Sequence, residues 1–240
     1  MMKSKKWLGT LALLTFVGAV LAFLFQAQIG QALFERAVKA RVGNDVLTGL
    51  PDGLHVGLCG TGSPLPNADR AGACTVVIAG NRVFIVDAGE GGARNIQLMG
   101  IPPARIERLF LTHFHSDHID GLGPMMLLRW TGASANMPLP VHAPDGVVDV
   151  IAGFNAAYTA DNRYRVAHHG AVIVPPSGGG ATAVPFVLAG DSAVVFDDKG
   201  VKVTAFRVDH RPVEPAVGYR FDYKGRSVVI SGDTGKSASL

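Results

Sequence analysis

The 240-residue sequence predicts an α/β fold in which packed sheets are covered by helices. Short strand candidates with small gaps dominate both ends of the region after residue 53, and helix candidates lie between them. The 30 glycines suit a fold with many turns, and 48% hydrophobic against 17% charged residues argue against disorder. The length suits one large domain or two small ones.

Nine segments combine apolar or β-branched residues with turn residues at their ends, which is typical of strands. Gly80-Asn81 and Lys224-Gly225 each separate two of these segments and predict hairpins. The strand candidates are Leu54–Leu58, Cys74–Ala79, Arg82–Asp87, Leu109–Thr112, Pro140–His142, Val194–Asp197, Lys202–Val208, Val217–Tyr223 and Ser227–Ser231.

Helices are expected at Gly91–Met99, Gly123–Thr131 and Pro144–Thr159. The second of these is unusually apolar, so we expect it to be buried. The glycine- and proline-containing stretch Ala171–Val184 is expected to be a mobile loop.

The N-terminus predicts a membrane-targeting helix. Three lysines at positions 3, 5 and 6 precede the uncharged run Trp7–Phe25, whose length is near the ~20 residues that a bilayer core requires. No small-x-small cleavage site follows, which favours an uncleaved signal anchor over residues 1–26 and a periplasmic or extracellular domain. A cleaved signal, giving a secreted protein, and a buried helix are the alternatives.

Residues 27–53 are expected to link this anchor to the catalytic domain, residues 54–240. Ala27–Val42 has helical periodicity, and the segment from Gly43 to Gly53 is rich in turn residues.

Cys59 and Cys74 are the only cysteines, and both adjoin strand candidates. If those strands pair, the sulfur atoms are neighbours and a disulfide can form in an oxidising compartment. Two buried free thiols are equally consistent with the sequence. The spacing does not resemble a thiolate zinc site.

The most informative segment is His113-Phe-His-Ser-Asp-His118, which follows a buried strand candidate. Imidazole and carboxylate are ligands that suit zinc and its first-row neighbours. Alternation along an extended chain points His113 and His115 the same way, and the following turn can aim Asp117 and His118 at a neighbouring point. The loop is therefore predicted to hold two metal ions.

Two later residues are candidates to complete such a centre. His210 follows the strand candidate Lys202–Val208, and Asp233 lies in a Gly-Asp-Thr turn directly after another strand. Taken alone, each residue is more typical of an ordinary loop or turn. The metal-binding loop upstream is what makes them candidate ligands.

These segments together resemble the metallo-β-lactamase superfamily, and within it the ribonuclease Z and arylsulfatase-like branch. The matching pieces occur in the family's order over most of Leu54 to Thr234. They are Leu58-Cys-Gly-Thr-Gly-Ser-Pro64, Val86-Asp-Ala-Gly-Glu-Gly91, Gly100-Ile-Pro-Pro-Ala-Arg-Ile106, Thr112-His-Phe-His-Ser-Asp-His118, His210-Arg-Pro-Val-Glu-Pro-Ala-Val-Gly-Tyr219 and Ser231-Gly-Asp-Thr234.

The resemblance implies a four-layer αββα sandwich with two zinc ions, or Mn²⁺ or Fe²⁺, per chain. By the family pattern, one ion is held by His113, His115 and His210. The other is held by Asp117 and His118, and Asp233 bridges both. Two ions about 3.5–4 Å apart would share a hydroxide and lower its pKa. Asp117 would orient that hydroxide or take its proton.

Two further implications concern residues around this site. Asp87 would fix a ligand imidazole by accepting its other ring N–H, although a strand-terminal turn cap is its plainer role. The loop Gly60–Ser63 would lie beside the pocket. The family also supplies a further ligand His after the Gly-Asp-Thr turn, which this sequence lacks. We therefore expect either a C-terminally incomplete domain or a weakly held second ion. His142, His168 and His169 fall outside the matching motifs and are not expected to substitute.

The predicted function is hydrolysis of an ester-type bond, a phosphodiester or sulfate ester, in a small-molecule or ester substrate. Alternatives are a ribonuclease Z-type endonuclease that processes tRNA 3′ ends, and an inactive truncated form or pseudoenzyme. β-Lactam hydrolysis rests on superfamily analogy alone. The net charge of +3 and the absence of a dense Lys/Arg arm disfavour nucleic acid without excluding it. A homodimer and membrane contact through the N-terminal helix are further expectations.

Overall fold

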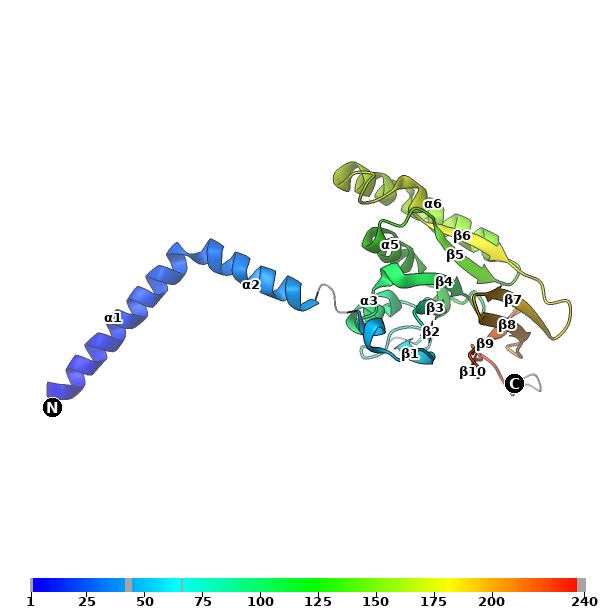
Figure 1. The fold of residues 1–240 in the computed structure, drawn as a ribbon, viewed down its shortest axis with the longest axis horizontal. Coiled ribbons are helices and arrows are strands. Elements are labelled where there is room, and N and C mark those ends of the chain that lie inside the picture. The colour runs from blue at the N-terminus through cyan, green and yellow to red at the C-terminus, as the bar shows by residue number, and fades with distance from the viewer. Residues whose placement is uncertain (1, 42–44, 66, 237–240) are drawn as a thin grey trace. The chain divides into compact units, whose positions relative to one another are not determined.

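The computed structural model describes residues 2–41, 45–65 and 67–236. Contacts divide the chain into two units, Met1–Asn44 and Asp45–Leu240. The first unit contains two helices, α1 (Met2–Leu24) and α2 (Gln26–Arg41), shown in Figure 1. The predicted helix Ala27–Val42 corresponds to α2, and its last residue lies outside the described residues. The predicted domain boundaries stay predictions.

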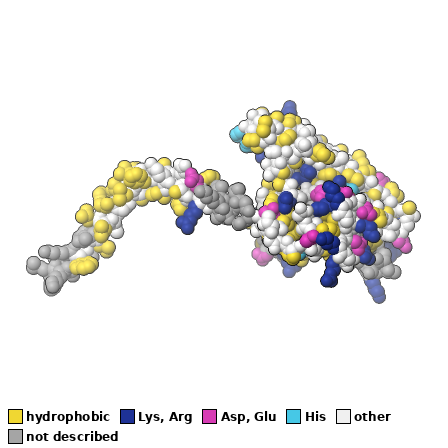
Figure 2. Space-filling view, viewed as in Figure 1, with side chains coloured by type: hydrophobic (Ala, Val, Ile, Leu, Met, Phe, Trp, Pro, Cys, Tyr) yellow, Lys and Arg dark blue, Asp and Glu magenta, His cyan; other side chains and the backbone are white. Residues whose placement is uncertain are grey.

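Large apolar side chains are exposed along α1, including Leu14, Phe16 and Phe23 (Figure 2). Among the described residues, no single helix is long and apolar enough to span a bilayer. Two segments, Leu13–Leu24 and Gln26–Ala37, satisfy the requirement only together, and their axes differ by 73°. The expected membrane-spanning anchor is therefore not supported.

The second unit contains two sheets, A and B. Sheet A has the strand order β1-β2-β3-β4-β5-β6; its first three strands are antiparallel, and β3 to β6 run parallel. Sheet B has the order β10-β9-β8-β7 and is antiparallel. The strands are β1 (Leu54–Gly60), β2 (Cys74–Ala79), β3 (Arg82–Val86), β4 (Ile106–Phe110), β5 (Leu139–Ala143), β6 (Ala181–Pro185), β7 (Ser192–Asp198), β8 (Val201–Arg207), β9 (Val217–Tyr223) and β10 (Arg226–Ile230).

The two faces of sheet A are both buried, and strand alternation distributes the residues between them. In β3, Phe84 joins the cluster between the sheets with Phe110 and Phe221, whereas Ile85 joins the cluster beneath the helices. Burial on both faces explains the nearly continuous apolar sequence of β2 and β3.

Three longer helices, α3 (Gly92–Leu98), α5 (Leu122–Ala133) and α6 (Val147–His169), accompany the short α4 (Ser116–Ile119) and the 3₁₀ turns η1 (Val46–Gly49), η2 (Pro103–Arg105) and η3 (Pro176–Gly178). The main helix–strand packing is on sheet A: α3 on β1, α5 and α6 on β5, and α6 on β6 (Figure 1). As expected, the apolar helix α5 is largely buried.

The expected fourth, helical layer on sheet B is not seen in residues 45–65 and 67–236. The physical reason is connectivity. The three longer helices connect strands of sheet A, whereas tight turns at Lys199-Gly200 and Lys224-Gly225 join strands within sheet B. The α/β architecture with one mixed sheet is confirmed, and the four-layer form is not.

Two further predictions were wrong. The stretch Ala171–Val184 is not entirely a loop, because its end forms most of β6, which pairs in parallel with β5. The Asn155 amide donates to the Ala181 carbonyl oxygen at 2.9 Å and accepts from its N–H at 2.9 Å, which anchors the strand to α6. A partner strand about 40 residues away leaves no local sequence pattern.

Helix α6 is also longer than predicted and continues to His169 instead of ending at Thr159. No glycine or proline interrupts it between Gly153 and Gly170. An Asp161–Arg165 pair, 2.7 Å apart and one turn apart in sequence, supports the added segment. His168 and His169 therefore stack on the last turn of a helix.

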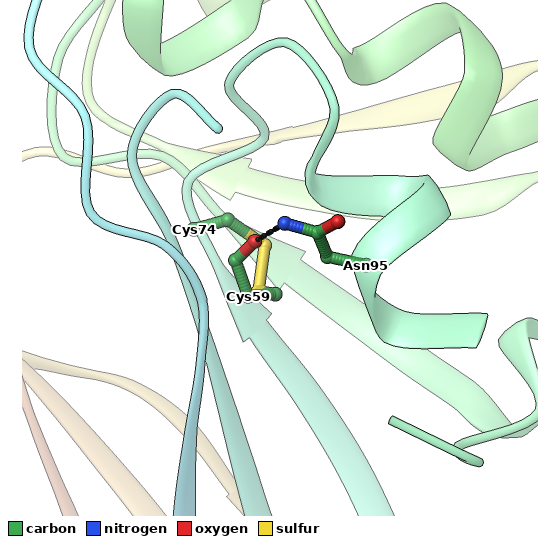
Figure 3. Close-up of a disulfide and its surroundings, with 3 residues drawn as sticks. All are labelled: Cys59, Cys74 and Asn95. Atoms are coloured by element: carbon green, nitrogen blue, oxygen red, sulfur yellow. Dashed lines mark hydrogen bonds between the residues drawn. A yellow bond between two sulfur atoms is a disulfide. The ribbon is translucent and has the colours of Figure 1, made fainter. Parts of the chain in front are cut away.

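Cys59 and Cys74 form a disulfide between the end of β1 and the start of β2 (Figure 3), which resolves the two alternatives that the sequence left open. The Asn95 amide from α3 donates to the Cys59 carbonyl oxygen at 2.8 Å. The disulfide closes the base of a loop, residues 60–73, and joins it to the sheet.

We predict that replacing both cysteines, Cys59→Ala with Cys74→Ala, lowers the free energy of unfolding by about 3 kcal/mol. The loop of 15 residues is then no longer constrained in the unfolded chain. Urea titration followed by circular dichroism measures the change. Reductant should lower the stability of the wild type and leave the double variant unaffected. Equal midpoints for oxidised and reduced wild type would contradict the prediction.

Candidate metal centre

Asp87 is the buried carboxylate on which the predicted metal loop is organised. It follows β3 with φ of 61°, a left-handed conformation that turns its side chain towards the end of β4. One oxygen accepts the Thr112 backbone N–H at 2.8 Å, and the Thr112 hydroxyl donates at 2.9 Å to the other. His118 Nδ1 lies 2.8 Å from that second oxygen. The donors that Asp87 binds thus include one ligand imidazole.

The loop keeps its shape because its backbone is also bonded to its neighbours. The His118 carbonyl oxygen accepts from Ala88 N–H at 2.8 Å, so α4 is held against the segment that follows β3. A Cβ at Gly89 would lie 2.2 Å from the Asp117 carbonyl oxygen. Only glycine fits this close approach of two backbones.

One set of ring nitrogens converges from two segments of the chain. His113 Nε2 lies 3.0 Å from His115 Nδ1, and His210 Nε2 lies 3.5 Å from the same His115 nitrogen. A tetrahedral zinc with Zn–N bonds of 2.0–2.1 Å would separate its ligand nitrogens by about 3.3–3.4 Å. The spacing of the three imidazoles fits such an ion.

A second set lies next to the first. His118 Nε2 is 3.7 Å from an Asp117 oxygen and 3.5 Å from an Asp233 oxygen. The ligand atoms of His113, His118 and Asp233 all lie within 4.8 Å of one another, as do those of His113, His115 and His210. Asp117 is not in either group. His113 is common to both groups, so the two sets adjoin.

Sheet B supplies the ligands that come from outside the loop. His210 follows β8, and Asp233 follows β10 after Gly232, whose φ is 62°. A Cβ on Gly232 would lie 2.8 Å from the Thr112 side chain, so this turn packs directly on the start of the metal loop. The Asp233 side chain is 46% exposed, so its carboxylate can contact an ion that enters from solvent.

The protonation of the two buried imidazoles differs. The pKa of His113 is lowered from 6.5 to about 3. Burial is the largest cause, and repulsion from neighbouring imidazoles adds to it. His113 is therefore neutral, the form that binds a metal. Burial also disfavours charge on His118, but the hydrogen bond to Asp87 and the charges of Asp87, Asp233 and Asp117 outweigh it and raise the pKa of His118.

Asp87 determines which ring nitrogen of His118 carries the hydrogen. Because the carboxylate can only accept, Nδ1 carries the hydrogen and Nε2 faces the carboxylates of Asp117 and Asp233. A fixed tautomer with a free nitrogen towards the site is the usual arrangement of a metal-binding histidine. The donor set therefore fits metal ions, with zinc the natural choice for imidazole and carboxylate.

A pocket of about 240 Å³ opens beside this site. Its lining includes Asp117, Asp120 and Glu90, together with Arg70 and Asn67 from the loop closed by the disulfide. It combines one guanidinium with three carboxylates. The predicted loop Gly60–Ser63 contributes only Ser63 among the residues that line this pocket.

The structure brings together all six predicted ligand residues and the predicted supporting residue Asp87. It does not bring the other histidines there. His142 is buried between the sheets and stacked on Phe110 with ring centroids 4.9 Å apart, and burial, with the nearby Arg108, lowers its pKa to about 4. His168 and His169 lie at the end of α6.

Sequence reasoning missed two supporting residues. The Thr112 hydroxyl contacts Asp87 and lies 3.0 Å from His113 Nδ1. The buried Tyr219 hydroxyl donates to the Leu111 carbonyl oxygen at 2.6 Å, and burial raises its pKa well above 10. Both residues stand in the quoted motifs, but a hydroxyl inside an apolar strand gives no sign of its partner.

Comparison with known proteins gives a consistent result. The sequence model described as "Metallo-beta-lactamase superfamily" matches residues 68–240. A protein named "Ribonuclease Z" from Mycobacterium avium (strain 104) is 41% identical over 189 residues, which are 78% of this chain and 65% of that protein. A protein of the same name from Mycolicibacterium gilvum is 40% identical over 75% of this chain and 62% of its own length. The chain thus spans slightly less than two thirds of these relatives.

Solved structures agree with the fold. Human tRNase Z, short form, superimposes with a TM-score of 0.55 at 26% identity, over 74% of this chain and 68% of the human one. A metallo-beta-lactamase fold protein from Bacillus subtilis gives a TM-score of 0.56 at 18% identity, over 79% and 66%, and supports the fold alone. No relative named here is an arylsulfatase, so that half of the expected branch is not supported.

We predict that Asp87→Asn weakens metal binding by about 10- to 100-fold while the fold persists. The amide would donate to His118 Nδ1 and leave the hydrogen on Nε2. That nitrogen would then lack the lone pair with which it binds a metal. Titration of the metal-free protein with zinc against a coloured chelator measures the loss. Asp120→Asn, an exposed carboxylate two residues after His118, serves as the control and should bind as the wild type does. Equal affinities for both variants would contradict the role of Asp87.

Proposed function

Because this chain belongs to the metallo-β-lactamase superfamily, we propose that it is a metal-dependent phosphodiesterase that cleaves RNA in the manner of ribonuclease Z. The observation that carries the proposal is the convergence of six imidazole and carboxylate side chains at one edge of the two sheets. The end of a precursor tRNA, the substrate that the tRNase Z name indicates, is the first RNA to test.

We propose two zinc ions per chain, with Mn²⁺ or Fe²⁺ as alternatives. His113, His115 and His210 would hold one ion. Asp117 and His118 would hold the other, and Asp233 would lie between them. When bound, such cations act as Lewis acids that polarise a phosphate and make water more acidic.

The side chains of this protein would position the reactants and move one proton. Asp87 keeps His118 Nε2 directed at the site, so no reorientation is needed when the substrate arrives. Asp117 lines the pocket and lies 3.7 Å from His118 Nε2, where its carboxylate can take a proton from the attacking water. Arg70, in the same pocket, supplies a cation for a phosphate oxygen.

An RNA substrate is favoured over a sulfate ester because the curated relatives at 39–41% identity carry the name Ribonuclease Z. The modest net charge of +3 means that local groups such as Arg70, not a general positive field, would bind the phosphates.

The location of the protein is a separate proposal. We propose that the catalytic unit works in an oxidising compartment, the periplasm or exterior, because the Cys59–Cys74 disulfide persists in such compartments and is rare in a reducing cytoplasm. There the substrate would be RNA outside the cytoplasm, and precursor tRNA would serve as a chemical analogue.

We predict that the metal-loaded protein cleaves a precursor tRNA with a 3′ trailer, that His115→Ala abolishes cleavage, and that Asp117→Asn lowers kcat by about 10²- to 10⁴-fold. The first variant loses an imidazole ligand, and the second loses the proton acceptor. Gel analysis of the labelled RNA measures both effects, and metal analysis accompanies each sample. His168→Ala, on the exposed end of α6, is the matched control and should keep full activity. Full activity of His115→Ala would contradict the assignment of His115 as a metal ligand.

We predict that both cysteines are protected from alkylation in intact cells. When cells are quenched in acid, denatured and then treated with a maleimide polymer, the protein should stay unshifted on a gel, and reduction before labelling should add two shifts, one for each of Cys59 and Cys74. Two shifts without reduction would place the protein in a reducing compartment and contradict the location.

A further inference from the structure

A second hollow, of about 140 Å³, adjoins the metal loop at the same edge of the sheets. Its walls come from the segments that follow β5 and β6 and from the loop before β9. They are mostly apolar, with Pro144, Phe186, Leu188 and Val217, and two charged side chains, Asp145 and Arg207, also line it. We call this hollow the base pocket, for the ligand assigned to it below.

The base pocket adjoins the metal loop through two direct contacts. Val217 N–H, in its wall, donates to the Thr112 carbonyl oxygen at 3.0 Å, and Thr112 precedes the first ligand, His113. On the other side, a Cβ at Gly146, next to Asp145, would lie 3.1 Å from the Phe114 ring. Both walls therefore rest on residues inside or next to the metal-binding motif.

Its position follows from strand direction. β4, β5 and β6 are parallel, so their carboxyl ends meet at one edge, and the residues that follow them are neighbours there. In sheets with parallel strands, ligands bind outside this edge. The metal loop follows β4, and the walls of the base pocket follow β5 and β6.

The chemistry of the base pocket selects a flat ligand with a polar edge. Apolar side chains can cover the two faces of a ring, Asp145 can accept a ring N–H, and Arg207 can donate to a ring oxygen or nitrogen. The volume admits one ring system and not a folded peptide segment. An exposed apolar side chain, Val187 at 79% exposure, stands at the rim. Unstacked bases of single-stranded RNA are bound in this way.

We propose that the base pocket binds one nucleobase of the substrate, in a nucleotide next to the cleaved phosphodiester. This inference rests on the proposed function. The strand would cross the metal centre with its backbone towards Arg70 in the pocket beside Asp117 and one base held in the base pocket. The base pocket would then set which linkage reaches the metal centre.

The test uses the full chain loaded with zinc and short single-stranded RNAs that carry 2-aminopurine at successive positions around one non-hydrolysable methylene phosphonate linkage. We expect the fluorescence of 2-aminopurine to change on binding at one position only, beside that linkage. Leu188→Asn should weaken binding of this RNA by about 5- to 100-fold, since one stacked base contributes that much to affinity. An abasic nucleotide at the same position should weaken binding to the wild type by a similar factor.

The combination of the two changes gives the decisive result. If Leu188 contacts the base, the Leu188→Asn substitution has no further effect on the abasic RNA. Val187→Asn at the rim should weaken binding, and Val194→Asn, an exposed valine on β7 away from the pocket, is the matched control and should not. Thermal unfolding of each variant identifies any loss of fold.

The two proposals fail in different ways. If the wild type neither binds these RNAs nor cleaves RNAs of the same sequence with an ordinary phosphodiester at that linkage, the proposed function is wrong. If the wild type binds the first set and cleaves the second, but the abasic nucleotide and Leu188→Asn leave the dissociation constant of the first and kcat/KM of the second unchanged, the base pocket is wrong and the proposed function stands. Additive effects of the two changes would also overturn the base pocket.

Discussion

The carboxylate of Asp87 is the constraint on which the rest of the site depends. It is 3% exposed, so its charge is stable only because N–H and O–H donors surround it. Thr112 supplies two of them and His118 a third. The same hydrogen bonds fix where the metal loop begins and which nitrogen of His118 faces the metal site. Removing an acceptor from such a network leaves buried donors unpaired, at a cost of about 1–3 kcal/mol each.

The second requirement is that two sheets meet at one edge. Sheet A supplies the loop with four ligands, and sheet B supplies His210 and Asp233. The buried Tyr219 hydroxyl and the Val217 N–H, both from β9, bind the Leu111 and Thr112 carbonyl oxygens. These bonds hold the edges of the sheets in register, so candidate ligands about 95 and 120 residues apart in sequence reach the same site. The aromatic cluster of Phe84, Phe110 and Phe221 fills the space behind them.

Much of this arrangement follows from sequence, because local patterns encode it. The bounds of β2 and β9 follow from apolar runs that end at turn residues. The residue types of the loop from His113 to His118 are enough to predict that it binds metal. His210 and Asp233 are different: each looks like an ordinary loop residue, and they become candidates only through the metal-binding loop upstream and the family's motif order. Where that order is matched, the structure brings the side chains together.

Most of the features that the sequence missed or left open share one physical origin, which is that their stabilising partner is distant in sequence. β6 exists because β5 and Asn155 complete its hydrogen bonds. The disulfide depends on the register of β1 on β2, which pairs Gly60 with Cys74. Thr112 and Tyr219 act through hydroxyl groups whose acceptors are set by the tertiary fold. The membrane anchor was an inference from the length of the apolar run and its flanking lysines, and no single helix among the described residues is long and apolar enough to support it. X-ray absorption and anomalous diffraction at the zinc edge on the metal-loaded full chain test the central claim most directly. The account predicts one scatterer among His113, His115 and His210 and another beside His118 and Asp233, whereas a protein that binds no ion there, or binds it at His168 and His169, would contradict it.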